Sequence, residues 1–570
     1  MSDFLFSTER MPDGALAAHL AHFLHPVMKE TIEWHGSWGS LALARSHFDV
    51  LAVVEAGGYI TVLVGDPVYH RRGSSALIDE STRDALHHQL SGSGLVEVAE
   101  CLDGHFAALA VDATGGNGAL ITDRFSFVGV FHAMHASGRG LVIGTHPDVV
   151  ARAANRSADI DLASAADLVS NITCTFPWTL YRGVRQAQPG VVRSFSAGEW
   201  RGAGVTYWEP NEGDAFASAR QAADAARNAI CGDVQAACAN TKQVGLLLSA
   251  GEDSRAVLGA IPPEKRVRAF TFADWESREV RITRRVAAAH GAELVVARRR
   301  SDHYIAGFES VASVVGSAHV FVDVHGFGIH ESQGLREMPV VLGGLSSDSL
   351  LKSSHAADAA PSEIQAIRKD LRREVADRRA AFRDELARMR PKTADEWTRL
   401  WPFSMRKHGA NVDGNRRLFR THEVYHSTGV LNVGAHTPVE WKRSRKLFVA
   451  ATRPLLRRTW HLPHGSHYFP YFGLPANAAL YLPLVLARAV RAAATGQVKA
   501  RHGPWPSWTG LSRSPEMLAA QRAHPLAQSP IASIFEPSAV SGLDQASAKW
   551  GAFRRFMLLQ LAFVSTKVQC

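Results

Sequence analysis

The amino-acid sequence predicts a two-domain protein of mixed α/β and α+β class. Its 570 residues are too many for one hydrophobic core. Before about residue 205 the chain reads as short strands separated by turns, and after about residue 215 apolar strands alternate with helices. We therefore expect residues 1–208 and 212–570 to form separate domains.

Short strands fill the first of these parts. Four apolar or alternating runs are each bounded by Gly, Asp or Asn, namely Tyr59–Gly65, His105–Asp112, Gly118–Asp123 and Gly140–Thr145. Short apolar or alternating runs between turn residues are typical of strands in a packed sheet. We expect these strands to pair in stacked antiparallel sheets.

Strands and helices alternate in the second part. The expected elements are a helix at 215–237, a strand before Ser249, a helix from about Ser254, a strand at 267–273, a helix at 277–291 and a strand at 292–297. Such alternation predicts a parallel sheet wound by right-handed crossovers. Farther on, we expect amphipathic helices at 361–390 and 546–564 and a loop at 501–515.

The composition excludes several classes of protein. Apolar residues make up 46% of the chain and charged residues 21%, as in ordinary soluble domains. The net charge of +9 suits an anionic ligand, but no Lys/Arg block is interleaved with aromatic residues, so we expect no nucleic-acid partner. Five cysteines without a CxxC pair argue against a disulfide framework or a thiolate zinc site and fit a reducing cytosol.

No segment of the sequence indicates targeting to a membrane. The start "MSDFLFSTER" lacks the apolar region of a signal peptide. The apolar run from Ala479 meets Arg488 well short of the roughly 20 residues that a membrane span needs. We therefore expect a cytoplasmic protein without membrane association, and a homodimer is an oligomeric state to be tested.

The stretch "VGLLLSAGEDSRAVLGA", residues 244–260, places small and polar residues between an expected strand and an expected helix. At the carboxyl end of a parallel strand, backbone N–H groups around Gly251 can approach an anion, and the helix N-terminus adds its dipole. The hydroxyls of Ser249 and Ser254 can donate to phosphate oxygens, and Asp253 suits a Mg²⁺ ion that bridges to the phosphates. The alternative is a plain strand-to-helix turn capped by Ser254.

These residues resemble a known family. "LLLSAGEDSR" is similar to the SGGxDS pyrophosphate loop of the asparagine-synthetase-like ATP pyrophosphatases, with Ala250 in place of its first glycine. "VVLGGLSSDSLL", residues 340–351, resembles their second phosphate segment. Upstream, "LDGHFAALAVD", "ITDRFSFVGVFH" and "GTHPDVVA" follow the order of the class II glutamine amidotransferase domain that precedes this synthetase. The resemblance covers roughly residues 36–351 well and the remainder loosely.

The resemblance implies a fold for each part. Residues 1–208 would form an Ntn-type αββα sandwich, the class II glutamine amidotransferase-like domain. Residues 212–570 would form a parallel-sheet PP-loop ATP pyrophosphatase domain, which is adenine nucleotide α-hydrolase-like, with a helical C-terminal part.

The resemblance also implies a site for ATP and Mg²⁺. The implied contacts are Ser249, Gly251, Asp253 and Ser254 with the pyrophosphate, Leu248 and Phe272 with adenine, Gly344 with the nucleotide, and Asp253 and Asp348 with a shared Mg²⁺ ion. The two carboxylates would thereby take part in catalysis. Phe272 can equally be plain core, and Asp348 can be a helix cap.

The N-terminal part departs from the family pattern. The class II glutaminase uses an N-terminal cysteine as nucleophile and, through its α-amine, as base. After removal of Met1 this chain would begin with Ser2, and "VGDPVYH" places Val64 where an asparagine donor is expected. The loss of both groups predicts a domain that does not hydrolyse glutamine and is retained as a relic or a docking module.

The synthetase part departs as well. Leu345 stands where asparagine synthetase has an acidic residue near the acyl-adenylate, and Ser349 replaces the acid after Asp348. An apolar side chain cannot accept a proton from an attacking amine, so another base is required. For the family's late lysine, which meets the pyrophosphate, we take Arg457 and Arg458 as catalytic substitutes.

A run of histidines lies close to these arginines. His461, His464 and His467 recur every third residue, but Pro463 and Gly465 interrupt any helix. A buried or substrate-facing loop is therefore favoured over a metal site.

Three functions are compatible with the sequence. The first is an AMP-forming carbon–nitrogen ligase that adenylates a small-molecule or peptide carboxylate for an amine that does not come from glutamine. In this respect the chain resembles the β-lactam synthetases, carbapenam synthetase and lasso-peptide cyclases, which are family members without the N-terminal cysteine. The second is asparagine synthesis from free ammonia, which Leu345 disfavours. The third is a non-catalytic scaffold in which the ATP site is a relic.

Overall fold

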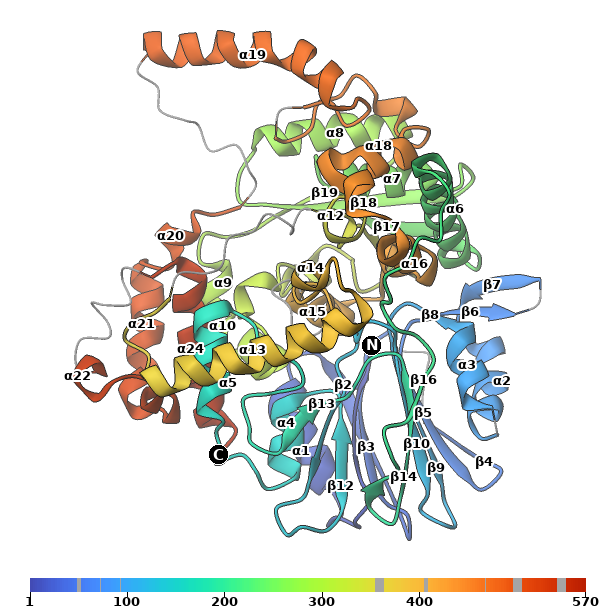
Figure 1. Cartoon of the computed structure of the whole chain (residues 1–570), viewed down its shortest axis with the longest axis vertical. Helices are drawn as coiled ribbons and strands as arrows, with labels where there is room; N and C mark the ends of the chain where they lie inside the picture. The colour runs from blue at the N-terminus through green and yellow to red at the C-terminus, as the bar shows by residue number, and fades with distance from the viewer. Residues whose placement is uncertain are drawn as a thin grey trace.

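A computed structural model gives the architecture of the chain (Figure 1). It describes residues 1–48, 53–71, 73–92, 94–353, 363–403, 409–466, 468–495, 505–540 and 550–570. As the sequence predicts, the N-terminal part contains antiparallel sheets and the later part contains a parallel sheet. In Figure 1 the antiparallel sheets occupy the lower half and the parallel sheet lies above them.

Two large antiparallel sheets form the N-terminal part. Their strands are β1 (Asp3–Ser7), β2 (Met28–Gly36), β3 (Gly39–Ser46), β4 (Val54–Ala56), β5 (Tyr59–Gly65), β9 (Phe106–Asp112), β10 (Gly118–Thr122), β11 (Phe131–Met134), β12 (Leu141–Gly144), β13 (Val184–Gln186), β14 (Val191–Ser196), β15 (Glu199–Trp200) and β16 (Val205–Thr206). One sheet has the order β13-β11-β12-β1-β3-β2 and the other β15-β14-β10-β9-β5-β4, with β16 paired to β14. A small third sheet contains β6 (Val68–Arg71), β7 (Ser74–Leu77) and β8 (Leu102–Asp103).

Helices cover both outer faces of this sandwich. Alternation along β1 sends Phe4 and Phe6 into the core between the sheets, whereas Leu5 belongs to the core on the other face. Helices α1 (Ala15–Leu24) and α4 (Pro147–Ala153) pack on that face. Helices α2 (Glu80–Leu90) and α3 (Leu95–Cys101) pack on the outer face of the second sheet. The layers are therefore helix, sheet, sheet and helix, while assignment to the Ntn class stays a prediction.

The later part contains a five-stranded parallel sheet. Its strands are β17 (Gln243–Leu247), β18 (Arg266–Ala273), β19 (Glu293–Arg298), β20 (Val341–Gly343) and β21 (Thr421–Glu423). Helices α6 (Ala219–Cys238), α7 (Glu252–Ala260) and α8 (Arg278–His290) accompany them. The strand order is β19-β18-β17-β20-β21, so the direction of winding reverses between β17 and β20. Ligands in open parallel sheets bind at such a switch point, beyond the carboxyl ends of the strands.

The remaining helices lie around this sheet and between the two parts. The longer ones are α5 (Leu162–Asn171), α10 (Phe308–Val315), α13 (Lys369–Met389), α15 (Gly409–Leu418), α16 (Thr428–His436), α18 (Lys446–Thr452), α19 (Leu474–Thr495), α21 (Pro515–Ala523) and α24 (Ala552–Lys567). Helix α13 runs between the two parts in Figure 1, and α19 extends away from the body of the molecule at the top. None of the described helices combines the length and hydropathy that a membrane span requires.

Several boundaries differ from the sequence-based expectation. Helix α7 begins at Glu252, so Ser254 lies inside its first turn and makes no cap. Helix α13 starts at Lys369 instead of near 361, and residues 361–362 and 546–549 lie outside the described residues. The loop expected at 501–515 contains the short helix α20 (Trp508–Leu511), and residues 501–504 are not described. Its Ser507 hydroxyl caps this helix, which explains the local order.

The two parts share extensive buried contacts. Arg420, just before β21, makes a two-point ion pair with Asp66 after β5, with distances of 2.7 and 2.8 Å. From α13, Arg378 pairs with Asp161 at the start of α5. The change from antiparallel to parallel sheets falls between β16 and β17, although the division into domains at residues 208 and 212 stays a prediction.

Candidate functional site

The two expected phosphate segments meet at the switch point of the parallel sheet. The first leaves β17 and enters α7, and the second leaves β20 and enters the short helix α12 (Ser347–Leu350). Gly344 lies against the first segment, because a Cβ added there would be 3.2 Å from the backbone nitrogen of Ser254. A side chain at Gly344 would therefore crowd the start of α7.

Hydrogen bonds within the first segment hold its turn together. The backbone N–H of Ser249 donates to Ser254 Oγ over 3.1 Å, and that of Gly251 donates to Ser249 Oγ over 3.0 Å. The N-cap of α7 is Gly251, whose side chain cannot accept a bond from the first turn. The hydroxyls of Ser249 and Ser254 therefore organise the loop, and phosphate would have to take over some of these donors.

Three carboxylates and one lysine form the polar centre of the site. Lys352 Nζ lies 2.5 Å from Asp253 Oδ1, 2.7 Å from Asp348 Oδ1 and 2.8 Å from Glu252 Oε1. Ser347 also donates to Asp253 Oδ1. The structure thus brings Asp253 and Asp348 together, as expected, but joins them through Lys352, which no motif in the sequence identifies.

Burial and charge act in opposite directions on these groups. Burial raises the pKa of Asp253 to about 6, against the lowering effect of the Lys352 ammonium. For Glu252, burial is outweighed by Lys352 and by Arg445, which together hold its pKa below the ordinary value. Arg445 Nε donates to Glu252 Oε1 over 2.8 Å. The start of α7 therefore carries two acids balanced by two fixed cations.

The residues expected beside adenine lie on neighbouring strands. Leu248 follows β17, is fully buried, and its backbone N–H donates to Phe270 of β18. Phe272 lies near the end of β18, is half-buried and packs on the core. Because its side chain is buried, Leu248 would contact a nucleotide through its backbone. Phe272 packs on the core but is partly exposed, so it also has surface that a nucleotide could contact.

The expected cations Arg457 and Arg458 lie next to each other on one turn of the chain. Both are exposed on the 3₁₀ turn η7 (Arg457–Thr459), and Arg458 acts electrostatically on His290 at the end of α8. Arg255 of α7 is fully buried instead and donates to the carbonyls of Leu462, Pro463 and Ala250 over 3.0, 2.6 and 2.8 Å. Arg255 thereby holds residues 462–465 against the first phosphate segment.

The histidine-rich segment therefore packs as a loop beside the site. His464 stacks on Tyr468 with ring centres 4.4 Å apart, and its Nε2 atom would be 3.7 Å from a Cβ added at Gly251. His467 lies outside the described residues. Among the described residues, no group of three or more His, Cys, Asp or Glu side chains is arranged to hold a metal ion.

A buried acid lies beside Leu345. The backbone N–H of Leu345 donates to Glu423 Oε2 over 2.9 Å, and burial raises the pKa of Glu423 to about 7. A Cβ added at Gly343 would come within 2.1 Å of the same carboxyl group, so β20 passes directly over it. Glu423 ends β21, a strand too short to be recognised in the sequence.

A histidine from the same region contacts the second phosphate segment. His426 Nε2 lies 2.7 Å from Ser346 Oγ, and its ring stacks on Phe127 with a centroid separation of 3.8 Å. Ser346 adopts a left-handed conformation, with φ of 71°. Phe127 belongs to the N-terminal part, which therefore helps to position this turn.

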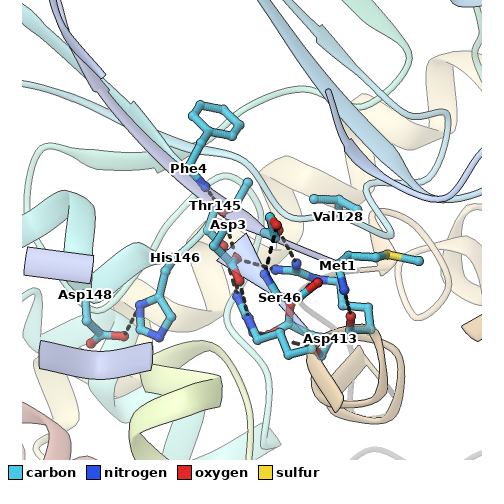
Figure 2. A network of polar contacts seen from close by, with 12 residues as sticks. Met1, Asp3, Phe4, Ser46, Val128, Thr145, His146, Asp148 and Asp413 are labelled. Atoms are coloured by element: carbon cyan, nitrogen blue, oxygen red, sulfur yellow. Dashed lines mark hydrogen bonds and ion pairs between the residues drawn. The ribbon is translucent and has the colours of Figure 1, made fainter. Parts of the chain in front are cut away.

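The start of the chain is buried against the parallel-sheet part (Figure 2). Asp3 accepts hydrogen bonds from Arg416 over 2.7 Å and from Arg417 over 2.8 Å, and both arginines belong to α15. Burial would raise the pKa of Asp3, but the two guanidinium groups hold it well below its ordinary value. The Oγ atom of Ser2 accepts the backbone N–H of Ser46 over 3.1 Å.

Two further observations concern the expected oxyanion segment and the cysteines. Val64 is fully buried within β5 and has no side-chain hydrogen-bond donor, and Asp66, two residues later, is bound by Arg420.

All five cysteines are free, as expected for a chain without a disulfide framework.

Comparison with known proteins adds a family to this geometry. A family model described as asparagine synthase matches residues 226–563, which is more than half of the chain. The match contains both phosphate segments, Lys352 and Glu423. A search of curated proteins finds no match.

Proposed function

Because the chain belongs to the asparagine synthase family, we propose that it is an AMP-forming ligase that uses ATP to join a carboxylate to an amine. The family supports ATP-dependent amide-bond formation in general. The finer proposal is that the substrate carboxylate attacks the α-phosphate of ATP, pyrophosphate leaves, and an amine then displaces AMP to give the amide. The substrate is a small-molecule or peptide carboxylate.

One observation carries this proposal, namely the meeting of the segments at Ser249–Ser254 and Gly344–Asp348 where the sheet changes direction. Both segments leave carboxyl ends of neighbouring parallel strands. This is the position where open parallel sheets bind nucleotides.

We assign roles to the residues of the site on this basis. Ser249, Gly251 and Ser254 would bind the pyrophosphate, whose growing negative charge is stabilised by backbone N–H groups and by the α7 dipole. Leu248, Phe272 and Gly344 would contact the nucleotide. Asp253 and Asp348 are predicted to share a Mg²⁺ ion, but in the structure the ammonium group of Lys352 lies between their carboxylates.

The proton released by the attacking amine requires a base, because Leu345 cannot accept it. Glu423 is hydrogen-bonded to the backbone of Leu345, and its pKa of about 7 suits proton transfer near neutral pH. We propose Glu423 for this role.

We further propose that glutamine is not the amine donor. The apolar side chain of Val64 has no hydrogen-bond donor for an oxyanion. Arg416 and Arg417 bind Asp3, and Arg420 binds Asp66, so these cations tie down the region where the family places its glutaminase site. Incubation of the purified protein with glutamine should release no glutamate. Release that depends on the protein would refute this part of the proposal.

A pyrophosphate-exchange assay tests the ligase activity. Labelled pyrophosphate should enter ATP in the presence of the correct carboxylate, and Asp253→Ala should abolish the exchange. Asp377→Ala is the matched control, because Asp377 is an exposed acid on α13. Equal exchange by the wild type and by Asp253→Ala would exclude this site.

The same assay separates the alternatives. Exchange that depends on aspartate, followed by asparagine formation with ammonium, would identify an ammonia-using asparagine synthase. The scaffold function is favoured by one observation: the backbone N–H groups of Ser249 and Gly251 already donate to serine hydroxyl groups within the loop. It predicts that titration calorimetry detects no ATP binding.

A further inference from the structure

The cation between Asp253 and Asp348 is a side chain of the protein itself. Three carboxylate oxygens from two separate segments converge on Lys352 Nζ at 2.5 to 2.8 Å. The lysine side chain is only 4% exposed. Its position is fixed further by the Phe448 ring of α18, whose centroid lies 4.3 Å from Nζ.

The residues at this point do not fit a magnesium ion. Mg²⁺ takes oxygen ligands at about 2.0 to 2.1 Å in octahedral geometry and keeps several waters. The oxygens around Lys352 Nζ are spaced for an ammonium group, which donates three hydrogen bonds. A metal ion at the same point would require Lys352 to leave its carboxylate partners.

The charges at the start of α7 explain why a fixed cation is needed. Phosphates beside Gly251 would approach Glu252, Asp253 and Asp348, and the repulsion would be strongest at the buried Glu252 carboxylate and weakest at Asp348, whose side chain is 62% exposed. Lys352 and Arg445 offset these acids. A lysine ammonium is a compact point charge and can compensate phosphate without the bidentate geometry of arginine.

We propose that Lys352 takes the place of the divalent cation between Asp253 and Asp348, so that the protein binds ATP without a metal ion at this point. The inference rests on the proposed function, since it assumes that ATP binds at this site. It assigns Lys352 as a positioning residue that holds the two phosphate segments together and offsets part of the negative charge of their three acids.

Calorimetric titration of the full chain with ATP, in excess Mg²⁺ and in EDTA, tests the proposal. The wild-type Kd should change by less than about threefold between the two conditions, which is under 1 kcal/mol. Lys352→Met should bind ATP at least about tenfold more weakly in EDTA and recover affinity in Mg²⁺. Lys446→Met is the matched control, because Lys446 is an exposed lysine at the start of α18. A wild type that binds ATP only with Mg²⁺ would overturn the inference and leave the proposed function standing.

Electron paramagnetic resonance of added Mn²⁺ gives a test that does not depend on ATP. The wild type should take up no Mn²⁺ at these carboxylates, whereas Lys352→Met should bind one ion that the further change Asp348→Asn removes. Binding of Mn²⁺ to the wild type that Asp348→Asn abolishes would overturn the inference, and this comparison holds even if Lys352→Met does not fold. Absence of ATP binding under every condition would refute the proposed function, and the Mn²⁺ titration would then still decide the role of Lys352.

Discussion

His105 Nε2 and His426 Nδ1 lie 2.7 Å apart and are joined by a hydrogen bond between the two parts of the chain. His105 precedes β9 in the N-terminal part, and His426 follows β21 of the parallel sheet. His426 also meets Ser346 in the second phosphate segment. The N-terminal part therefore reaches the candidate ATP site through two imidazole rings, which gives that part a structural role independent of glutamine chemistry.

Replacement of His105 should disturb the candidate ATP site from a distance. His105→Ala removes one partner of the buried His426, and an unpaired buried polar group costs about 1 to 3 kcal/mol. We expect the free energy of unfolding in urea to fall by this amount and ATP binding to weaken. His88→Ala, an exposed histidine on α2, is the control. Identical urea midpoints for His105→Ala and the wild type would show that the contact does not contribute.

The same pair predicts a dependence of stability on pH. Burial lowers the pKa of His105 to about 3 and that of His426 well below 6.5. The folded protein keeps both rings neutral, whereas the unfolded chain binds protons as the pH falls below about 6.5. The stability supplied by these neutral rings is therefore lost on acidification, by up to about 1.4 kcal/mol per pH unit for each ring. Urea unfolding between pH 7 and pH 5 should show a shallower decline for His105→Ala than for the wild type.

The buried ion pairs of Asp3 should be among the most sensitive points of the fold. Asp3→Ala leaves the two buried guanidinium groups of Arg416 and Arg417 with Asp413 as the carboxylate that they still share. Removal of one partner from a buried ion pair costs about 3 to 5 kcal/mol. Chemical denaturation should show this loss, whereas Asp13→Ala, at a largely exposed acid, should change little. A loss below about 1 kcal/mol for Asp3→Ala would contradict the structural role given to the network.

The sequence predicts the central strands well because strong local signals define them. Strand β5 occupies Tyr59–Gly65 as expected, and β18 begins one residue before the expected range. An uninterrupted aliphatic run with a glycine-containing turn at its end is enough to locate β17 and the loop after it. The two phosphate segments are likewise recognisable as motifs, and the structure brings them together.

The groups that complete the site have no comparable local signal. Lys352 lies four residues after Asp348, and nothing in that spacing reveals that Asp253 and Glu252 converge on the same atom. Glu423 ends a three-residue strand whose place depends on the order of the whole sheet. Arg457 and Arg458 are identified by their order in the sequence relative to the family's late lysine. Lys352 is recognised only from its burial and its contacts with three carboxylates in the structure. Periodicity and motifs therefore predict the elements of the candidate site but not the contacts between segments that are distant in the sequence.

Gly343 should tolerate no side chain. A Cβ at this position would lie 2.1 Å from the Glu423 carboxyl oxygens, and β20 and β21 are paired at these two residues. Gly343→Ala should destabilise the fold by about 1 to 3 kcal/mol through overpacking. Gly232→Ala is the control, because nothing lies within 4 Å of a Cβ there and alanine favours a helix interior. The double variant Gly343→Ala/Glu423→Ala should lose less stability than the sum of the two single variants, and strict additivity would argue against the collision.

The protonation of Glu423 should oppose the effect of the histidines on stability. Burial raises the pKa of Glu423 from 4.5 to about 7, so between these values the folded state holds a proton that the unfolded state releases. The stability due to this group is fully present below about pH 4.5 and is lost as the pH rises towards 7, by up to about 1.4 kcal/mol per pH unit. Glu423→Gln has no such proton to lose, so its stability relative to the wild type should be greater at pH 8 than at pH 5. Glu385→Gln, an exposed acid on α13, should show no such difference. Urea unfolding of the three proteins at both values measures this directly, and a Glu423→Gln curve parallel to that of the wild type would mean that Glu423 is already ionised at pH 5.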